Sequence, residues 1–146
     1  GGGTVVRATN KRNSVGDAFT RWDSAGHWLE YTVVAPAEGY YHLAFVYCSD
    51  MNSAERTIEV NGTLVDPEAP IVLPATGGWA NTADDWRLFV VPDPAHGRPL
   101  KIKLNAGPNV VRLTNTNGRG ANLDYLAIFS PDVEVSRPML EQRLAP

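Results

Sequence analysis

The sequence predicts an all-β fold, a sandwich of two antiparallel sheets with about eight to ten short strands. Three observations favour it. Short segments rich in β-branched and aromatic residues follow one another at the spacing typical of sandwiches and barrels. Thirteen glycines and eleven prolines interrupt the chain repeatedly. No long stretch has the 3.6-residue apolar period of a helix.

The expected strands are segments of alternating or largely apolar residues: 27–34, 40–48, 55–60, 71–73, 86–91, 100–104, 110–114 and 123–129. In segment 40–48, Leu43 and Phe45 fall on one face, and the opposite face is also fairly apolar. This pattern indicates a central strand that is covered on both sides. Asn61-Gly62 follows segment 55–60 and predicts a tight hairpin, because a type I′ turn needs positive φ at both central residues.

The two ends of the chain depart from this pattern. Gly1-Gly2-Gly3 precedes no basic and apolar leader, so no signal peptide is expected in this chain. Ser130-Pro131 ends the last strong strand. We therefore expect a sandwich domain over residues 1–131 and an extension or linker over 132–146. Within the extension, residues 133–135 are β-like and could add an edge strand.

Composition excludes several classes of protein. The chain has 146 residues, enough for one domain, with a net charge of −3. That charge gives no indication of a basic face for nucleic acid. The sequence contains no run of eighteen apolar residues, so it predicts no membrane-spanning helix. Cys48 is the single cysteine, so neither an internal disulfide nor a cysteine-rich zinc site is possible.

Motifs for catalysis are missing from the sequence. It contains no HExxH and no GxSxG. Asp84-Asp85 is the only paired carboxylate. A glycosidase needs two carboxyl groups across a cleft, about 5–10 Å apart, and adjacent residues approaching a strand point to opposite sides. A small hydrolase is therefore not favoured.

Two tryptophans stand among polar loop residues. Trp79 lies in segment 75–82 and Trp22 in segment 19–26, both rich in Gly, Thr, Asn or Asp. A tryptophan in such a setting either packs on something or binds something. A sugar ring presents an apolar face and a fringe of hydroxyls, which suits an aromatic plate beside hydrogen-bonding side chains. The alternative is that either tryptophan closes the end of the sandwich core.

Five blocks of the sequence, in order, resemble carbohydrate-binding modules of families 6 and 35. They are Gly26–Tyr31 with Gly39–Leu43, Val60–Gly62, Leu73–Trp79, Leu104–Asn109 and Asn122–Leu126. The resemblance runs from about Thr4 to Phe129. It implies a galactose-binding-like jelly-roll sandwich that is not catalytic. It also implies that the module holds a polysaccharide-degrading enzyme, a glycoside hydrolase or lyase, on its glycan, in a secreted or cell-surface bacterial protein.

The resemblance also implies where a sugar would bind, in the loops at one end of the sandwich. Trp79 matches a ring-stacking position and Asn122 a hydrogen-bonding one. A second aromatic would be Trp22 or Phe19. Arg56 and Arg119 are candidates for an acidic ligand, because arginine grips a carboxylate with two hydrogen bonds. For both arginines, simple solvation at the surface is the alternative.

A structural Ca²⁺ is a further implication of the resemblance. Its ligands would include Asp124 and acidic residues of a first strand, which this chain does not have. Ca²⁺ takes about six to eight oxygen ligands, so one aspartate is insufficient. We hypothesise that the segment 133–135 replaces that strand and that Glu134 supplies a carboxylate.

Two functions of different classes remain open from the sequence. One is a carbohydrate-binding module whose partner is an oligo- or polysaccharide and whose site lies at the loop end. The other is a structural or protein-interaction sandwich within a larger enzyme, without sugar binding. Retention on glycans by the wild type and by Trp79→Ala separates them.

Overall fold

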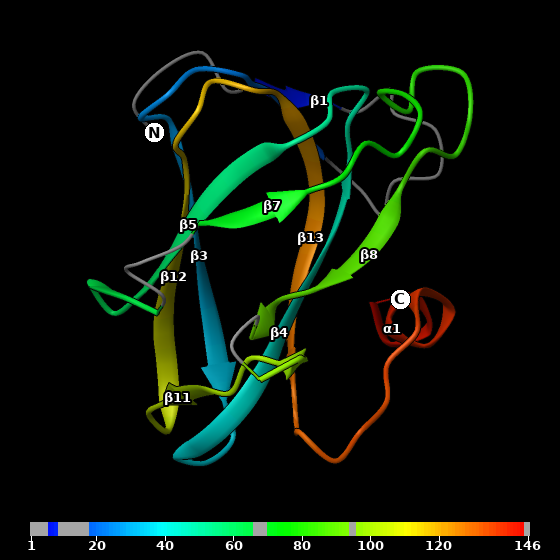
Figure 1. The fold of residues 1–146 in the computed structure, drawn as a ribbon. Coiled ribbons are helices and arrows are strands. Elements are labelled where there is room, and N and C mark those ends of the chain that lie inside the picture. Colours follow the sequence, from blue (N-terminus) through cyan, green and yellow to red (C-terminus); the bar gives the residue numbers. More distant parts are fainter. Residues whose placement is uncertain (1–5, 9–17, 66–69, 94–95, 145–146) are drawn as a thin grey trace.

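Two antiparallel sheets pack face to face in the computed structural model, which describes residues 6–8, 18–65, 70–93 and 96–144 (Figure 1). The first sheet has the order β1-β2-β13-β4-β11, with β8 also paired to β4. Its strands are β1 (Val6–Ala8), β2 (Ala18–Trp22), β13 (Ala121–Phe129), β4 (Gly39–Cys48), β11 (Ile102–Leu104) and β8 (Arg87–Val90).

The second sheet has the order β3-β12-β5-β6, with β7 also paired to β5. Its strands are β3 (Trp28–Ala35), β12 (Gly107–Asn115), β5 (Ala54–Val60), β6 (Thr63–Leu64) and β7 (Ile71–Leu73). A small hairpin joins β9 (Pro92–Asp93) to β10 (Arg98–Pro99), and one helix, α1 (Arg137–Leu144), follows the sandwich.

The all-β sandwich predicted from the sequence is confirmed, and each of the eight expected segments contains an observed strand. Asn61 and Gly62 have φ values of 50° and 86°, so the turn between β5 and β6 has the positive φ at both positions that the sequence predicts. Strand β2 lies at the start of segment 19–26, which we expected to be a loop. It is a strand paired to β1 and, with a break in register, to β13, and Arg21 within it has a φ of 57°.

Strand β4 is central and covered on both faces, as predicted. It pairs with β13 on one side and with β11 and β8 on the other. Leu43, Phe45 and Tyr47 lie in the main core between the two sheets, while Val46 and Cys48 lie in a second buried cluster. Burial of one large apolar side chain contributes about 1.5–3 kcal/mol, so both faces of β4 stabilise the fold.

The C-terminal extension differs from the prediction. Residues 133–135 form no strand, and α1 begins at Arg137. The predicted edge strand is therefore wrong, because Val135 packs against the second buried cluster rather than pairing with a sheet edge. In the described part of the chain, no helix has the length and apolar character needed to span a bilayer.

The turn at residues 105–109 connects the two sheets. It leaves β11, which pairs with β4, and enters β12, which pairs with β3 and β5. The Asn109 side chain fills it, since its Nδ2 donates to the Asn105 carbonyl at 2.9 Å and to the Gly107 carbonyl at 3.0 Å. These bonds satisfy backbone carbonyls at the turn and at the start of β12.

Candidate functional site

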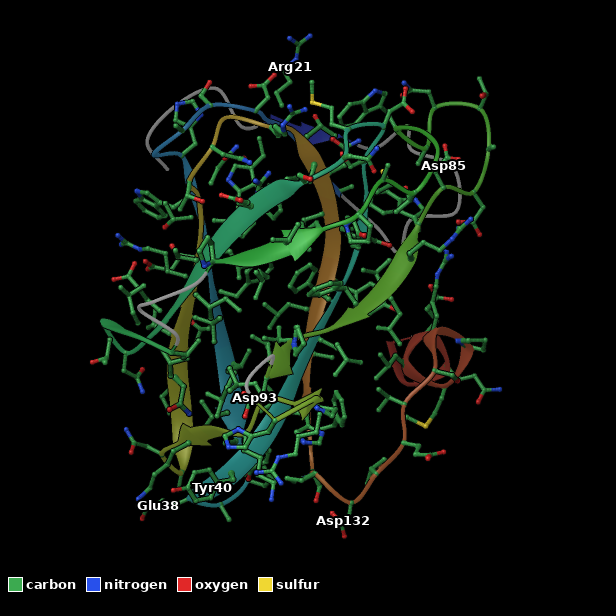
Figure 2. The ribbon with its side chains drawn as sticks, viewed as in Figure 1. Arg21, Glu38, Tyr40, Asp85, Asp93 and Asp132 are labelled. Atoms are coloured by element: carbon green, nitrogen blue, oxygen red, sulfur yellow. The ribbon has the colours of Figure 1, made fainter. Side chains whose placement is uncertain are left out.

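A cleft of about 530 Å³ opens at one end of the sandwich. We call it the loop-end cleft. Its lining residues come from the end of β2, the loop after β4, the loop between β7 and β8, and the start of β13: Thr20, Arg21, Trp22, Asp23, Met51, Trp79, Asn81, Gly120, Ala121 and Asn122. Figure 2 places Arg21 and Asp85 at this end of the molecule, opposite Glu38, Tyr40 and Asp132.

The Trp79 side chain is half-buried and lies against Gly120 in the loop-end cleft. A Cβ added to Gly120 would stand 3.2 Å from Cη2 of the indole and 3.4 Å from Cβ of Asp23. Ser49 holds the backbone of Gly120 in place, because its hydroxyl donates to the Gly120 carbonyl at 2.6 Å. The glycine therefore lets the ring lie against the backbone with part of its surface open.

Residues 74–86, which connect β7 to β8, carry Trp79, and we call them the platform loop. Oδ2 of Asp85 accepts a hydrogen bond from the Ala80 N–H at 3.0 Å. The same carboxylate lies so close to Gly78 that an added Cβ would come within 2.8 Å of the Asp85 Cγ, so this position has no room for a side chain. Ala80 has a φ of 58°, which is strained for a residue with a side chain. Asp85 thus holds the backbone on both sides of Trp79 in one conformation.

Asn122 links the platform loop to the first sheet. It is 4% exposed and its Nδ2 donates to the Trp79 carbonyl at 3.1 Å. Its neighbours on the cleft wall include the exposed side chains of Arg21, Asp23 and Asn81. The cleft therefore combines an aromatic surface with amide, carboxylate and guanidinium groups that hydrogen-bond hydroxyls.

Arg56, predicted as a candidate for gripping an acidic ligand, is completely buried. Its Nη2 donates to the carbonyls of Trp22 at 3.1 Å and Arg119 at 3.0 Å, and its Nη1 donates to the Glu55 carbonyl at 2.8 Å. Burial lowers the pKa of Arg56 to about 9, which leaves the group charged at neutral pH. The binding role is therefore wrong: Arg56 is an internal brace for the loops beside the cleft.

The second aromatic expected from the resemblance is not available as a stacking surface. Trp22 is 1% exposed, with Arg56 4.0 Å from its ring and its Nε1 donating to the His27 carbonyl at 2.9 Å. Phe19 packs edge-on against Tyr31, with ring centroids 6.1 Å apart, and joins the main core. Phe19 does not line the cleft, whereas Trp22 forms part of its wall with almost no exposed surface.

Arg119 is exposed in the turn between β12 and β13, and its side chain does not line the cleft. Its carbonyl accepts hydrogen bonds from Arg56 and, at 3.1 Å, from Asn115 Nδ2. The sequence reasoning missed Arg21, Asp23, Met51, Asn81 and Gly120, which do line the cleft. The alternation of side-chain directions along β2 was the available signal for Arg21, because neighbouring residues of a strand face opposite sides and Trp22 is buried.

The calcium hypothesis finds no donor set in the described residues. They contain no cluster of three or more Asp, Glu, His or Cys side chains that could hold a metal ion. Asp124 is 5% exposed within β13, whereas Glu134 is exposed on the segment that follows that strand. A calcium requirement therefore stays a prediction from the resemblance alone.

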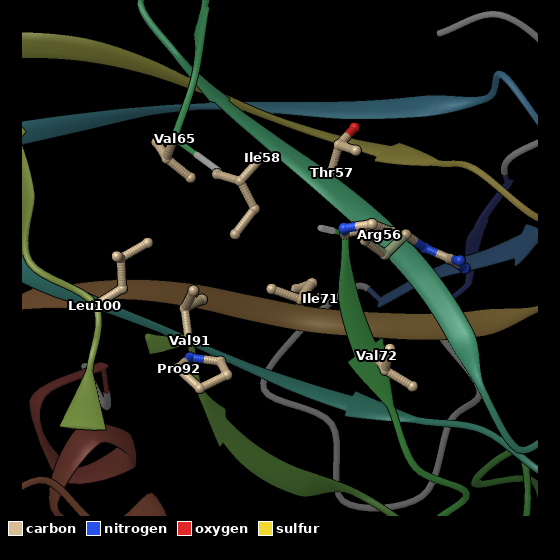
Figure 3. Close-up of a pocket in the computed structure, with 10 residues that line it drawn as sticks. Arg56, Thr57, Ile58, Val65, Ile71, Val72, Val91, Pro92 and Leu100 are labelled. Atoms are coloured by element: carbon tan, nitrogen blue, oxygen red, sulfur yellow. The ribbon is translucent and has the colours of Figure 1, made fainter. Parts of the chain in front are cut away.

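A second cavity of about 350 Å³ opens at the side of the sandwich (Figure 3). Its wall is mostly aliphatic, with Ile58, Val65, Ile71, Val91 and Leu100 around it. The charged end of Arg56 points away from these side chains (Figure 3). Such a wall does not suit a ligand covered with hydroxyl groups, because their hydrogen bonds to water would be lost without replacement.

The two packed antiparallel sheets have the type of fold found in family 6 and family 35 carbohydrate-binding modules. Three solved structures illustrate the likeness. A family 35 module from Clostridium thermocellum is 27% identical with a TM-score of 0.70, covering 86% of this chain and 88% of that one.

The second structure is a family 6 module of Cellvibrio mixtus lichenase 5A in complex with cellotriose. It is 24% identical with a TM-score of 0.62, and 86% of each chain is covered. The third is the cycloalternan-forming enzyme of Listeria monocytogenes in complex with a pentasaccharide substrate, 23% identical with a TM-score of 0.68. There the match covers 87% of this chain but 11% of the enzyme. No family model and no curated protein matches the sequence.

Proposed function

We propose that this chain is a carbohydrate-binding module and that the loop-end cleft is its sugar site. The observation that carries the proposal is the half-buried Trp79 held against Gly120 beside the amides of Asn81 and Asn122. A sugar would lay its C–H face on the indole and direct its hydroxyls to the surrounding polar groups. The likeness to a module in complex with cellotriose supports this assignment.

The arrangement of the cleft favours binding without catalysis. Among the described residues that line it, Asp23 is the sole carboxylate, and glycoside hydrolysis uses two. Stacking on one aromatic ring contributes about 1–3 kcal/mol by analogy with bases. We therefore expect a modest affinity for a single site, raised when a polymer presents many copies of the ligand.

The first test is affinity electrophoresis of the wild type and Trp79→Ala through gels containing xylan, β-glucan or pectin. We expect at least one polysaccharide to retard the wild type and the variant to lose that retardation. Trp28→Ala is the matched control, because Trp28 is also half-exposed but lies on the second sheet beneath Arg112. Retardation that survives in Trp79→Ala and is lost in Trp28→Ala would move the site to the sheet face.

We further propose that the module tethers a polysaccharide-active enzyme outside the cell. The match to the cycloalternan-forming enzyme covers 11% of that enzyme's chain. A module of this fold within a much longer enzyme supports a place beside a catalytic domain. Polysaccharides too large to cross a membrane are met outside it, which supports the location. Hydrolysis of an insoluble polysaccharide by the full-length protein, with and without Trp79→Ala, tests the tethering: the variant should lose rate on insoluble but not on soluble substrate.

A further inference from the structure

Helix α1 packs on the outer face of the first sheet, next to the platform loop. Leu140 is 8% exposed and is buried in one cluster with Val46, Cys48, Ala80, Trp86 and Tyr125. Ala80 directly follows Trp79 in the chain and is completely buried. Because an isolated helix of eight residues is not stable in water, α1 depends on this packing, and the platform loop shares the same packed surface.

Arg137, the first residue of α1, connects the helix to the platform loop through polar contacts. Its side chain is 19% exposed, and its Nη1 lies 3.0 Å from Asp84 Oδ1 and donates to the Trp86 carbonyl, also at 3.0 Å. Its Nε pairs with Glu141 one turn further along the helix at 2.8 Å. Partial burial makes these charge-assisted bonds stronger than exposed ion pairs.

Asp84 and Asp85 are adjacent but act in opposite directions along the platform loop. Asp84 faces the helix through Arg137, whereas Asp85 faces back toward Gly78 and the Ala80 N–H. A displacement of Asp84 would therefore move the carboxylate that holds the backbone around Trp79. The chain of contacts runs from α1 through two neighbouring residues to the stacking surface.

We propose that Arg137 is a positioning residue for the sugar site: docking of α1 through the Arg137–Asp84 contact holds the platform loop, and with it Trp79, in the binding conformation. This inference rests on the proposed function, because it assigns Trp79 a role in binding. Arg137 itself does not line the loop-end cleft. Its effect is to order the loop before the ligand arrives, which reduces the entropy cost of binding.

The test compares Arg137→Met with Arg112→Met. Arg112 is the matched control because it also pairs with a carboxylate, Glu30 at 2.7 Å, and also contacts a tryptophan, Trp28, but on the second sheet. Hydrogen exchange of the sugar-free protein should become faster in residues 76–85 of Arg137→Met, with residues 115–120 unchanged. A merely structural role would accelerate exchange in both segments.

Binding to the polysaccharide that retards the wild type is the second readout. We expect Arg137→Met to weaken retardation about three- to tenfold, the range expected for loss of one ordered contact, and Arg112→Met to leave it unchanged. Arg137→Lys, which keeps the charge and is less disruptive to folding, should give an intermediate value in both readouts.

The two proposals fail in different ways. If no polysaccharide retards the wild type, the proposed function fails, while the exchange experiment still reports whether α1 orders the loop. If Trp79→Ala abolishes retardation but Arg137→Met and Arg137→Lys change neither exchange nor binding, the positioning role of Arg137 is refuted and the sugar site stands.

Discussion

Replacement of Arg56 by methionine tests whether this arginine is an internal brace or a ligand contact. The guanidinium donates three hydrogen bonds to carbonyls and lies 4.0 Å from the Trp22 ring centroid. Hydrogen bonds from charged groups contribute about 1.5–3 kcal/mol each, and a buried cation over an aromatic ring contributes about 2 kcal/mol. Removal of the buried cation also recovers its desolvation penalty, which offsets part of the loss.

The acceptors of Arg56 reduce the expected cost further. Asn115 Nδ2 donates to the same Trp22 and Arg119 carbonyls, at 3.1 Å in both cases. In Arg56→Met these carbonyls keep one donor each, and only the Glu55 carbonyl loses its side-chain partner. We therefore expect Arg56→Met to lower the free energy of unfolding by about 1.5–3 kcal/mol, the net contribution of one hydrogen bond from a charged group.

A double-mutant cycle with Asn115→Ala gives a sharper result. With both side chains removed, the carbonyls of Trp22 and Arg119 lose every side-chain donor that the structure shows for them. The double variant should be less stable than the sum of the two single changes by about 1–3 kcal/mol, the cost of leaving buried acceptors unsatisfied. Urea unfolding at equilibrium measures all four corners of the cycle.

Two results would refute this reasoning about Arg56. Additive single changes would mean that the shared acceptors do not couple the two side chains. A loss of binding confined to acidic oligosaccharides, with stability unchanged, would mean that Arg56 contacts a ligand carboxylate after all. If Arg56 is an internal brace, Arg56→Met should weaken the binding of acidic and neutral oligosaccharides by the same factor.

Three further predictions concern the cleft and the ionisable groups. Gly120→Ala places a methyl group 3.2 Å from the Trp79 ring. Titration calorimetry should show that the sugar affinity falls about tenfold, equivalent to about 1.4 kcal/mol. An unchanged affinity would contradict the close packing of the ring on Gly120. Burial raises the pKa of Tyr47 and of Tyr125 to about 12, so the unfolded state, with a tyrosine pKa near 10, loses these protons first. Stability should fall above about pH 10, and Tyr125→Phe should flatten that loss in urea unfolding at pH 9 and pH 11. Burial, with Lys101 nearby, lowers the pKa of His42. The unfolded state therefore binds the proton more readily, and the free energy of unfolding should fall as the pH drops below about 6.5. If His42→Gln loses stability with falling pH as steeply as the wild type, another group is responsible.

Most of the strand framework could be predicted because alternation is a local signal. The two apolar faces of β4 already indicated two covered sides, and the structure supplies the second cover with α1 and Trp86. Arg56 shows the limit of reasoning from the chemistry of one side chain. It shares the inward face of the alternating segment 55–60 with Ile58, a signal for burial that neither expectation, a ligand contact or solvation at the surface, took into account.

The architecture of the cleft could not be derived from local patterns. Asn122 reaches the carbonyl of Trp79 across 43 positions, and Arg137 reaches Asp84 across 53. Such contacts depend on how the two sheets and α1 pack together. The polar neighbours of Trp79 were enough to propose a binding role for it, whereas the contacts with Gly120 and Asp85 were visible only in the fold.

Nitrogen-15 NMR of the tryptophan side chains tests the central claim most directly. The four indole N–H signals of the wild type are assigned with single Trp→Phe variants and followed during titration with the oligosaccharides of the retarding polysaccharide. A sugar site in the loop-end cleft predicts that the Trp79 signal shifts in a saturable way while those of Trp28 and Trp86 do not move. A saturable shift of Trp28 with Trp79 unmoved would contradict it.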